Sequence, residues 1–372
     1  MQILVLLTAN ISLSDWETKG ILRRELSIYN NLKKKYQFTF LTYGDSRDNK
    51  FKKIKYFNII NIYNKKKFLR IFKIIYPLFF IIKNHKYFKK FKIVKSNQLL
   101  GAHLGILIKI LYKSKFICRM GYDPNFFYSK EEKKIFRKFF LKIYSIIVYY
   151  FADKIIVTTS EMKFFLVNNF NQDKNKIFIN PNYVDTKLFN NKLISNKKIN
   201  KLVTVARFDD QKNLIFLFNQ INITNCTLDI IGPSKEANKF LNLIKKFDTK
   251  KINFLGTIKH EQLNAKYKNY DAFILLSKYE GNPKSLLEAM SSKLIIIASN
   301  VSGINNIIIN KKNGFLLNFT DGELPSLIND LNNKKYNLNK IRNNGRSFVL
   351  NNNSLNNISR NEEFIYCSVL KI

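Results

Sequence analysis

The chain has few of the residues that bind metals or form disulfides. It contains 3 cysteines and 3 histidines among 372 residues. Cys118, Cys226 and Cys367 are too widely separated for a disulfide framework or a metal-ligand pattern, so we expect them to be inert core thiols. Neither a His-Glu-x-x-His nor an Asp-x-Asp pattern occurs. We therefore expect no bound zinc and no essential divalent ion held by the protein.

Long apolar runs are also missing. The composition, 46% hydrophobic and 24% charged, is typical of a globular protein. No segment reaches the roughly 18 uncharged apolar residues that a membrane span requires. The apolar part of the N-terminus is only Ile3–Leu7, and no basic stretch precedes it, which favours a first β-strand over a signal peptide. We expect a cytoplasmic protein that does not cross a bilayer.

Acidic residues are scarce, and their distribution is uneven. The chain has 26 Asp and Glu against 64 Lys and Arg, a formal net charge of +38. From Asn49 to Tyr122 there is no acidic residue, while 19 Lys and Arg alternate with aromatic and aliphatic residues. The charge could reflect a compositional bias with no role, or it could bind anionic lipid or nucleic acid. No nucleic-acid-binding motif is recognisable, so we expect no nucleic-acid partner.

Two segments combine this basic character with apolar residues at helical spacing. In Lys65–Lys95, apolar residues recur near that spacing with Lys and Arg between them, and Pro77 is expected to kink or interrupt the helix. Glu132–Tyr150 repeats the pattern, with Phe136 and Phe140 among its apolar positions. Each segment alone fits a core-facing amphipathic helix with a basic outer face. Together they predict reversible contact with an anionic membrane surface.

Apolar strands and periodic helices alternate along the chain, which predicts an α/β fold of two domains. Ile3–Leu7 is strand-like, the loop Thr8–Gly20 leads to a helix at Ile21–Lys34, and Phe38–Thr42 is again a strand. The polar segment Asn190–Asn200 lacks periodicity and is typical of a linker. We predict domains over 1–192 and 201–345, a linker over 193–200 and a helical tail over 346–372.

The segment Ser277–Met290 carries the clearest functional pattern. It follows the apolar run Ala272–Leu276, which predicts a buried strand. Glu280 is followed by the turn Gly281-Asn282-Pro283 and then by a predicted helix that contains Glu288. A helix N-terminus binds anions, and carboxylates beside it can hydrogen-bond the hydroxyls of a sugar. The pattern suits a nucleotide sugar, although two solvated glutamates at an ordinary strand-to-helix connection would give it too.

Two cations occupy the loop that opens the second half of the chain. The predicted strand that begins at Lys201 is followed by Arg207 and Lys212. Strand ends carry ligand loops in α/β folds, and two cations at such a position can neutralise a diphosphate leaving group. Taken alone, the pair could equally be surface charge.

These motifs resemble the family 4 retaining glycosyltransferases, in which two Glu residues separated by seven residues continue as an Ala-Met helix and a strand. Further resemblance lies in Asp15–Gly20 and in the Asn182–Phe189 segment. The resemblance implies the GT-B architecture, in which two Rossmann-like, doubly wound domains face a cleft, with a C-terminal helix that crosses back to the first domain. It also implies a retaining, metal-independent hexosyltransferase with no cofactor besides a nucleoside-diphosphate sugar as co-substrate.

The resemblance assigns roles to individual residues. Glu280 would lie at the donor sugar, and Glu288 would hold the nucleotide ribose. Arg207 and Lys212 would neutralise the departing diphosphate. Further donor contacts are expected from Gly20, Gly281, Asn282, Pro283 and Leu287, and acceptor or sugar contacts from Gln98, Arg119 and Tyr122.

The implied acceptor is a glycan or a lipid-linked sugar used in the synthesis of cell-surface polysaccharide or glycolipid. Two other functions stay open at this point: a GT-B sugar-nucleotide epimerase, and a basic nucleic-acid-binding protein suggested by charge alone. The residues do not specify the sugar, the nucleotide, the acceptor or the oligomeric state.

Overall fold

The computed structural model of the chain describes residues 1–54, 56–63, 72–121, 123, 125–126, 135–191 and 198–370. The described chain divides into two compact units. Unit 1 contains Met1–Thr18, Glu25–Pro181 and Ile358–Ile372, and unit 2 contains Lys19–Arg24 and Asn182–Asn357. The C-terminal residues therefore pack with the N-terminal part of the chain, whereas the short segment Lys19–Arg24 packs with unit 2.

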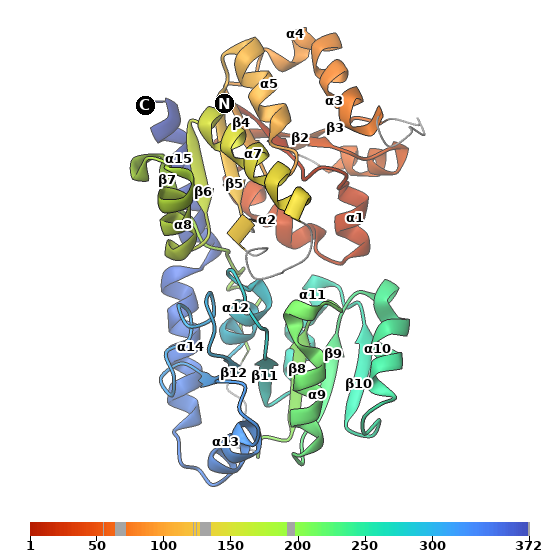
Figure 1. The fold of residues 1–372 in the computed structure, drawn as a ribbon, viewed down its shortest axis with the longest axis vertical. Helices are drawn as coiled ribbons and strands as arrows, with labels where there is room; N and C mark the ends of the chain where they lie inside the picture. Colours follow the sequence, from red (N-terminus) through yellow and green to blue (C-terminus); the bar gives the residue numbers. More distant parts are fainter. Residues whose placement is uncertain are drawn as a thin grey trace. The chain divides into compact units, whose positions relative to one another are not determined.

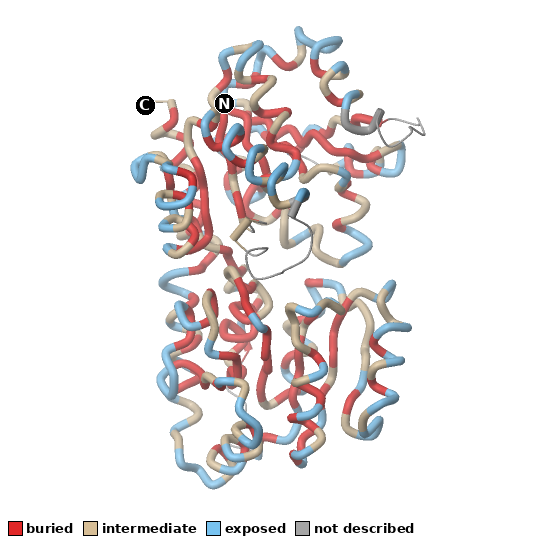
Figure 2. Tube along the Cα trace, in the orientation of Figure 1, coloured by how far each residue is buried: buried red, intermediate tan, exposed pale blue. Residues whose placement is uncertain are grey.

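Unit 1 is built on a parallel sheet of seven strands in the order β3-β2-β1-β4-β5-β6-β7. Most strand residues are buried, as the Val- and Ile-rich runs of the sequence predict for a sheet covered on both faces (Figure 2). The strands are β1 Gln2–Leu6, β2 Gln37–Thr42, β3 Phe57–Asn61, β4 Ile93–Ser96, β5 Lys115–Met120, β6 Lys154–Val157 and β7 Ile177–Ile179.

Helices pack against the sheet of unit 1 (Figure 1). One core cluster joins β1, β2 and β4 to three of the helices, through residues such as Leu6, Ile81, Phe88, Val94 and Leu104. The helices are α1 Leu13–Thr18, α2 Leu22–Leu32, α3 Phe72–Lys83, α4 His85–Phe88, α5 His103–Tyr112, α7 Ile135–Phe151, α8 Ser160–Phe170 and α15 Leu355–Leu370. The first three residues of α2 and of α15 belong to unit 2.

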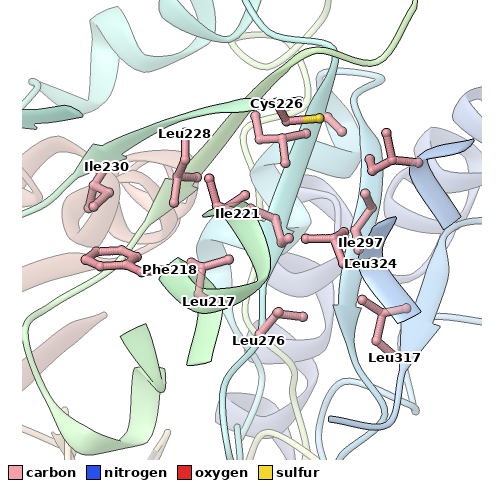
Figure 3. Close-up of a cluster of buried hydrophobic side chains, with 14 of the residues drawn as sticks. Leu217, Phe218, Ile221, Cys226, Leu228, Ile230, Leu276, Ile297, Leu317 and Leu324 are labelled. Atoms are coloured by element: carbon pink, nitrogen blue, oxygen red, sulfur yellow. The ribbon is translucent and has the colours of Figure 1, made fainter. Parts of the chain in front are cut away.

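Unit 2 is built on a parallel sheet of six strands in the order β10-β9-β8-β11-β12-β13. Alternate residues of one strand join different core clusters: Ile274 belongs to one and Phe273 and Leu275 to the other. This period of two places a packed layer on each face of the sheet (Figure 3 shows the first cluster). The strands are β8 Lys201–Val205, β9 Thr227–Ile231, β10 Ile252–Gly256, β11 Ala272–Leu275, β12 Ile295–Ser299 and β13 Phe315–Leu317.

The helices of unit 2 divide between these two clusters. Leu217 and Phe218 contribute to the first cluster, whereas Leu263, Leu286 and Met290 contribute to the second. The helices are α9 Leu214–Asn222, α10 Ala237–Ile244, α11 His260–Tyr267, α12 Lys284–Ser291, α13 Glu323–Asn332 and α14 Leu338–Asn352.

Both sheets reverse their strand order at an internal point, between β1 and β4 in unit 1 and between β8 and β11 in unit 2. The prediction of two Rossmann-like, doubly wound α/β domains is therefore confirmed. In open parallel sheets the loops at the carboxyl ends of strands diverge at such a reversal, which is where ligands usually bind.

Local structure differs from the sequence prediction in two places. The predicted loop Thr8–Gly20 contains the helix α1, whose Leu13 and Trp16 are buried. Asp48, from the 3₁₀ segment Ser46–Lys53, accepts hydrogen bonds from the backbone N–H groups of Leu13 and Ser14 and so caps the helix. Pro77 does not interrupt its helix, because α3 runs through it from Phe72 to Lys83.

The prediction for Lys65–Lys95 implied that Lys95 belongs to a basic surface, and this is wrong. Lys95 lies in β4, and its side chain is 1% exposed. Its ammonium pairs with Glu362 of α15, which is also 1% exposed. Glu362 accepts further hydrogen bonds from Asn180 Nδ2 at 2.8 Å and from Tyr366 Oη at 2.8 Å. This buried cluster fastens the C-terminal helix to the rest of unit 1.

Some of the predictions concern residues outside the described ones. These are Tyr122, residues 193–197 of the predicted linker, and residues 65–71 and 132–134 of the two basic segments. Among the helices that the structure describes, none is long and apolar enough to cross a membrane.

Candidate functional site

The reversal point of unit 2 brings together two loops that are far apart in the sequence. β8 and β11 are parallel neighbours, with Ala272 opposite Leu202 and Phe273 opposite Val203. The loop after β8 carries Arg207 and Lys212, and the loop after β11 carries Glu280. Because both loops leave the same edge of the sheet, their side chains can meet there.

Lys212 and Glu280 do meet, in a close and largely buried ion pair. Lys212 Nζ donates to Glu280 Oε1 at 2.5 Å, with side-chain exposures of 12% and 7%. Ser277 Oγ donates to the same oxygen at 2.7 Å, and Gln211 Nε2 lies 3.4 Å from Glu280 Oε2. Three donors thus fix the carboxylate, and the carboxylate in turn fixes the position of the ammonium.

The turn after Glu280 is held by two hydrogen bonds that Asn182 donates to Asn282. The backbone N–H of Asn182 donates to Asn282 Oδ1 at 2.9 Å, and Asn182 Nδ2 donates to the Asn282 carbonyl at 2.6 Å. Pro283 is the N-cap residue of α12, and no side-chain hydrogen bond caps the helix there. A rigid turn that ends in a helix N-terminus without a side-chain cap is a suitable place for an anion.

Gly303 allows a second loop to approach this turn more closely than any other residue would. It has a φ of +83°, and a Cβ built on it would lie 2.2 Å from the Glu280 carbonyl oxygen and 2.3 Å from that of Gly281. The backbone N–H of Glu280 also donates to the Ser302 carbonyl at 3.3 Å. The loop that follows β12 therefore packs against the backbone of Glu280 and helps to hold it in position.

We expect Gly303→Ala to lower the free energy of unfolding of unit 2 clearly more than Gly322→Ala. Both glycines have nearly the same positive φ, but a Cβ at Gly322 would meet nothing within 4 Å. The control should therefore show only the backbone strain, about 1–2 kcal/mol, whereas Gly303→Ala must also displace the turn. Urea unfolding, monitored by circular dichroism, measures the free energy of unfolding of both variants. Equal losses would mean that the close approach is unimportant.

Glu288 lies inside α12 and is almost completely buried. Its Oε1 is 3.0 Å from His260 Nε2, and because a carboxylate can only accept, we assign the proton of that hydrogen bond to Nε2. Arg24 Nη1, from the segment that packs with unit 2, is 3.8 Å from the same oxygen. Glu288 thus has an imidazole and a guanidinium as neighbours.

Gly20 lies against the loop that leads into α11. It has a φ of +68°, and its carbonyl accepts a hydrogen bond from the backbone N–H of His260 at 3.3 Å. A Cβ at this position would come within 3.2 Å of the Ile258 carbonyl oxygen. Gly20 and Glu288 are therefore linked through the same histidine.

Two of the predicted donor residues lie differently from the others. Arg207 is mostly exposed and pairs with Asp209, with 3.2 Å between Nη2 and Oδ2, rather than with Glu280 or Glu288. The side chain of Leu287 is fully buried in the second core cluster of unit 2. Leu287 therefore holds α12 against the sheet, and only its backbone is available for a ligand.

In unit 1, two of the three residues predicted to contact an acceptor or sugar lie next to each other. Gln98 follows β4 and Arg119 lies near the end of β5, which is its neighbour in the sheet. Gln98 Oε1 accepts from the backbone N–H of Gly121 at 3.0 Å, and a Cβ on Gly121 would lie within 4 Å of both side chains. The third residue, Tyr122, is outside the described residues.

The sequence did not single out four residues that surround these side chains. Gln211 and Ser277 hold Glu280, His260 holds Glu288, and Gly303 supports the turn. Gln211 and Ser277 lie beside predicted site residues, so their positions could have indicated them. His260 gave no such signal, because it follows a different strand, β10. Within the described residues, no group of three or more His, Cys, Asp or Glu could hold a metal ion.

Comparison with solved structures identifies the class of fold. Sucrose-phosphate synthase from Thermosynechococcus elongatus aligns over 100% of this chain and 100% of its own, with a TM-score of 0.80 and 17% sequence identity. The chain thus has the GT-B fold that the resemblance implied. At this identity the likeness shows the fold alone.

Sequence comparisons find stretches of the chain that are similar to glycosyltransferases. Residues 185–348 match the family described as Glycosyl transferases group 1, a range that includes Arg207, Lys212, Glu280 and Glu288. A 100-residue stretch is 32% identical to the UDP-N-acetylglucosamine–peptide N-acetylglucosaminyltransferase GtfA subunit of Limosilactobacillus reuteri, covering 27% of this chain and 19% of that protein. A 61-residue stretch is 43% identical to the UDP-Gal:alpha-D-GlcNAc-diphosphoundecaprenol alpha-1,3-galactosyltransferase of Escherichia coli, covering 16% and 15%. The matched stretches span less than a fifth of these relatives.

Proposed function

We propose that the protein is a family 4 retaining glycosyltransferase that moves a hexosyl group from a nucleoside-diphosphate sugar to a glycan or lipid-linked acceptor. The observation that carries the proposal is the buried Lys212–Glu280 pair at the strand-order reversal, next to the N-terminus of α12. A carboxylate, a cation and a helix N-terminus at one place can bind a sugar that is attached to a diphosphate. The family matched by residues 185–348 and the UDP-sugar names of the two relatives support the same donor class.

In the proposed reaction, the bond between the anomeric carbon and the diphosphate oxygen breaks, and the acceptor oxygen attacks from the same face, so that the configuration is retained. As the new bond forms, the acceptor hydroxyl passes its proton to the departing diphosphate oxygen, which lies on the same face of the sugar. The leaving diphosphate gains negative charge, which Arg207, Lys212 and the N-terminal dipole of α12 stabilise. Glu280, fixed by its three donors, orients the sugar for attack.

The remaining donor contacts follow from the same assignment. Gly281, Asn282 and Pro283 would line the path of the diphosphate, and Gly20 would let backbone approach it closely. Leu287 would contribute through its backbone, because its side chain is in the core. Glu288 would hydrogen-bond the ribose, with His260 keeping its carboxylate in place.

We assign donor binding to the predicted domain over 201–345 and acceptor binding to that over 1–192, with the predicted linker at 193–200 and tail over 346–372. These bounds differ from those of the compact units, because Asn182–Asn357 pack as part of unit 2 and Ile358–Ile372 as part of unit 1. Gln98, Arg119 and Tyr122 would contact the acceptor or the sugar. The name of the Escherichia coli relative includes a sugar carried on a lipid diphosphate, which supports a lipid-linked acceptor. Synthesis of a cell-surface polysaccharide or glycolipid in the cytoplasm would use such an acceptor.

A panel of nucleotide sugars tests the function. We expect release of nucleoside diphosphate from one or a few donors, with UDP sugars examined first, and equal rates with and without EDTA. Metal independence is expected because Arg207 and Lys212 supply the cations at the diphosphate. Epimerised sugar without nucleotide release would indicate an epimerase instead, and no reaction with any donor would contradict the proposal. Loss of activity in EDTA that magnesium or manganese restores would contradict only the metal-independent mechanism.

Glu288→Gln and Glu280→Gln should affect different kinetic constants. Ribose contacts are similar in the ground state and the transition state, so Glu288→Gln should raise the KM for the donor about tenfold or more and change kcat less. Glu280→Gln should lower mainly kcat. Glu261→Gln, on an exposed position of α11, is the matched control and should change neither constant. The reverse pattern in the two glutamine variants would exchange or remove the proposed roles.

A further inference from the structure

α7 exposes a continuous apolar stripe. Phe136 is 81% exposed and Phe140 69%, and the other exposed members follow at spacings of three and four residues, which puts them on one side of a helix. Among the described side chains of this helix, the large exposed apolar residues are Phe136, Phe139, Phe140, Ile143, Ile146, Ile147 and Tyr150.

The opposite side of the same helix faces the core of unit 1. Ser145, Val148 and Tyr149 are fully buried, and Tyr149 Oη donates to the buried Asp123 Oδ2 at 2.5 Å. The ring of Tyr149 also packs edge-on against Phe170 of α8 at 5.1 Å. The stripe therefore lies on the exposed side of α7, and the alternative that it faces the core is wrong. An exposed apolar patch of this extent is unusual for a surface that contacts only water.

Neighbouring helices expose further large apolar residues. α5 contacts both α3 and α7, and the three helices cover one face of the sheet of unit 1 (Figure 1). α3 exposes Ile75, Phe79 and Ile82, again at spacings of four and three residues, and α5 exposes Ile110 and Leu111. We call this combined surface, formed by the exposed apolar residues of α3, α5 and α7, the outer helical face.

The charged side chains within the helices of this face are all positive. No Asp or Glu occurs within α3, α4, α5 or α7, whereas Lys83, Lys86, Lys113 and Lys142 are exposed there. Asp153, just after α7, is already paired with Lys109 at 2.9 Å and also lies 3.9 Å from Lys115. The surface thus offers exposed ammonium groups beside large apolar side chains.

We propose that the outer helical face binds reversibly to an anionic lipid surface, with α7 lying in the plane of the interface. Its Phe and Ile side chains would insert among the acyl chains, while the lysines contact the lipid phosphates. A polyanion without an apolar phase would satisfy only the lysines, which is why lipid is favoured over nucleic acid. The proposal does not depend on the transferase assignment, because no residue of the outer helical face belongs to the candidate site.

Co-sedimentation of the full chain with vesicles tests this proposal. We expect binding to vesicles of phosphatidylcholine with phosphatidylglycerol, and much weaker binding to phosphatidylcholine alone. High salt should release most of the protein from the anionic vesicles. Equal binding to the two kinds of vesicle, or binding to neither at low salt, would overturn the proposal.

A matched pair of variants separates the outer helical face from general surface hydrophobicity. Phe136→Ser with Phe140→Ser should reduce the affinity for anionic vesicles by at least about tenfold, because two large apolar side chains no longer insert. The control Phe364→Ser, on α15, removes an aromatic ring that is 64% exposed but lies outside the outer helical face. This variant should bind anionic vesicles with the same affinity as the unaltered chain.

Circular dichroism would check that each of these variants folds, and release of nucleoside diphosphate in the absence of vesicles should be unchanged in all of them. Equal loss of vesicle binding in the Phe364 variant would overturn the proposal. So would a stable dimer in solution that the double variant dissociates, because the stripe would then be an interface between two copies.

Discussion

Arg207→Ala and Lys212→Ala are each expected to lower kcat by roughly a hundredfold or more at saturating donor. Each variant removes a positive charge whose interaction with the diphosphate strengthens as the leaving group gains charge. The two side chains have different surroundings: Arg207 is mostly exposed beside Asp209, whereas Lys212 is largely buried against Glu280. Single-turnover measurements of nucleoside diphosphate release would report the chemical step directly.

Two controls keep this prediction interpretable. Lys246→Ala removes an exposed lysine of unit 2 outside the candidate site and should leave kcat unchanged. Lys212→Ala also leaves the Glu280 carboxylate without its ammonium, so part of its effect could come from lost stability. Combining Lys212→Met with Glu280→Gln removes both charges, and this variant should fold but stay inactive. Near-normal kcat in the Arg207 or Lys212 variant would show that the diphosphate binds elsewhere.

The sequence predicted the candidate site better than it predicted the contacts within it. The buried strand before Ser277 and the turn at Gly281-Asn282-Pro283 indicated where Glu280 would lie, and the strand at Lys201 did the same for Lys212. Their direct pairing depends on β8 and β11 being neighbours in the sheet, although about 70 residues separate them in the chain. Hydrophobic periodicity identifies strands but does not specify their order.

The same limit left one alternative open and caused one wrong prediction. Periodicity showed that Phe136 and Phe140 share one side of a helix, but it could not show whether that side faces the core or the solvent. Lys95 was grouped with surface lysines because its partner, Glu362, is 267 residues away and on the last helix. A buried ion pair of this kind leaves no local pattern in the sequence.

Glu362 is ionised in this cluster because several partners outweigh the cost of burial. Burial raises the pKa of Glu362, but the charges of Lys95 and Arg119 and the hydroxyl of Tyr366 hold that pKa below the usual range for a glutamate. Asn180 donates to the second carboxylate oxygen. A carboxyl whose pKa is lower in the folded state stabilises the fold above its unfolded pKa, and this contribution is lost as the pH falls through the folded pKa. The ion pair between Lys95 of β4 and Glu362 of α15 therefore holds α15 against the sheet of unit 1.

Lys95→Met is expected to lower the free energy of unfolding of unit 1 by about 3–5 kcal/mol, because it leaves the Glu362 carboxylate buried without its paired ammonium. Trp16, the only tryptophan, is buried in unit 1, and its fluorescence in a urea titration would report this transition. The matched control is Lys35→Met, which breaks an exposed pair with Glu363 on the same helix, 2.6 Å between Nζ and Oε1, and should cost less than about 1 kcal/mol. Adding Glu362→Gln to Lys95→Met should recover much of the loss. Similar losses in the Lys95 and Lys35 variants would show that the buried pair does not hold the C-terminal helix in place.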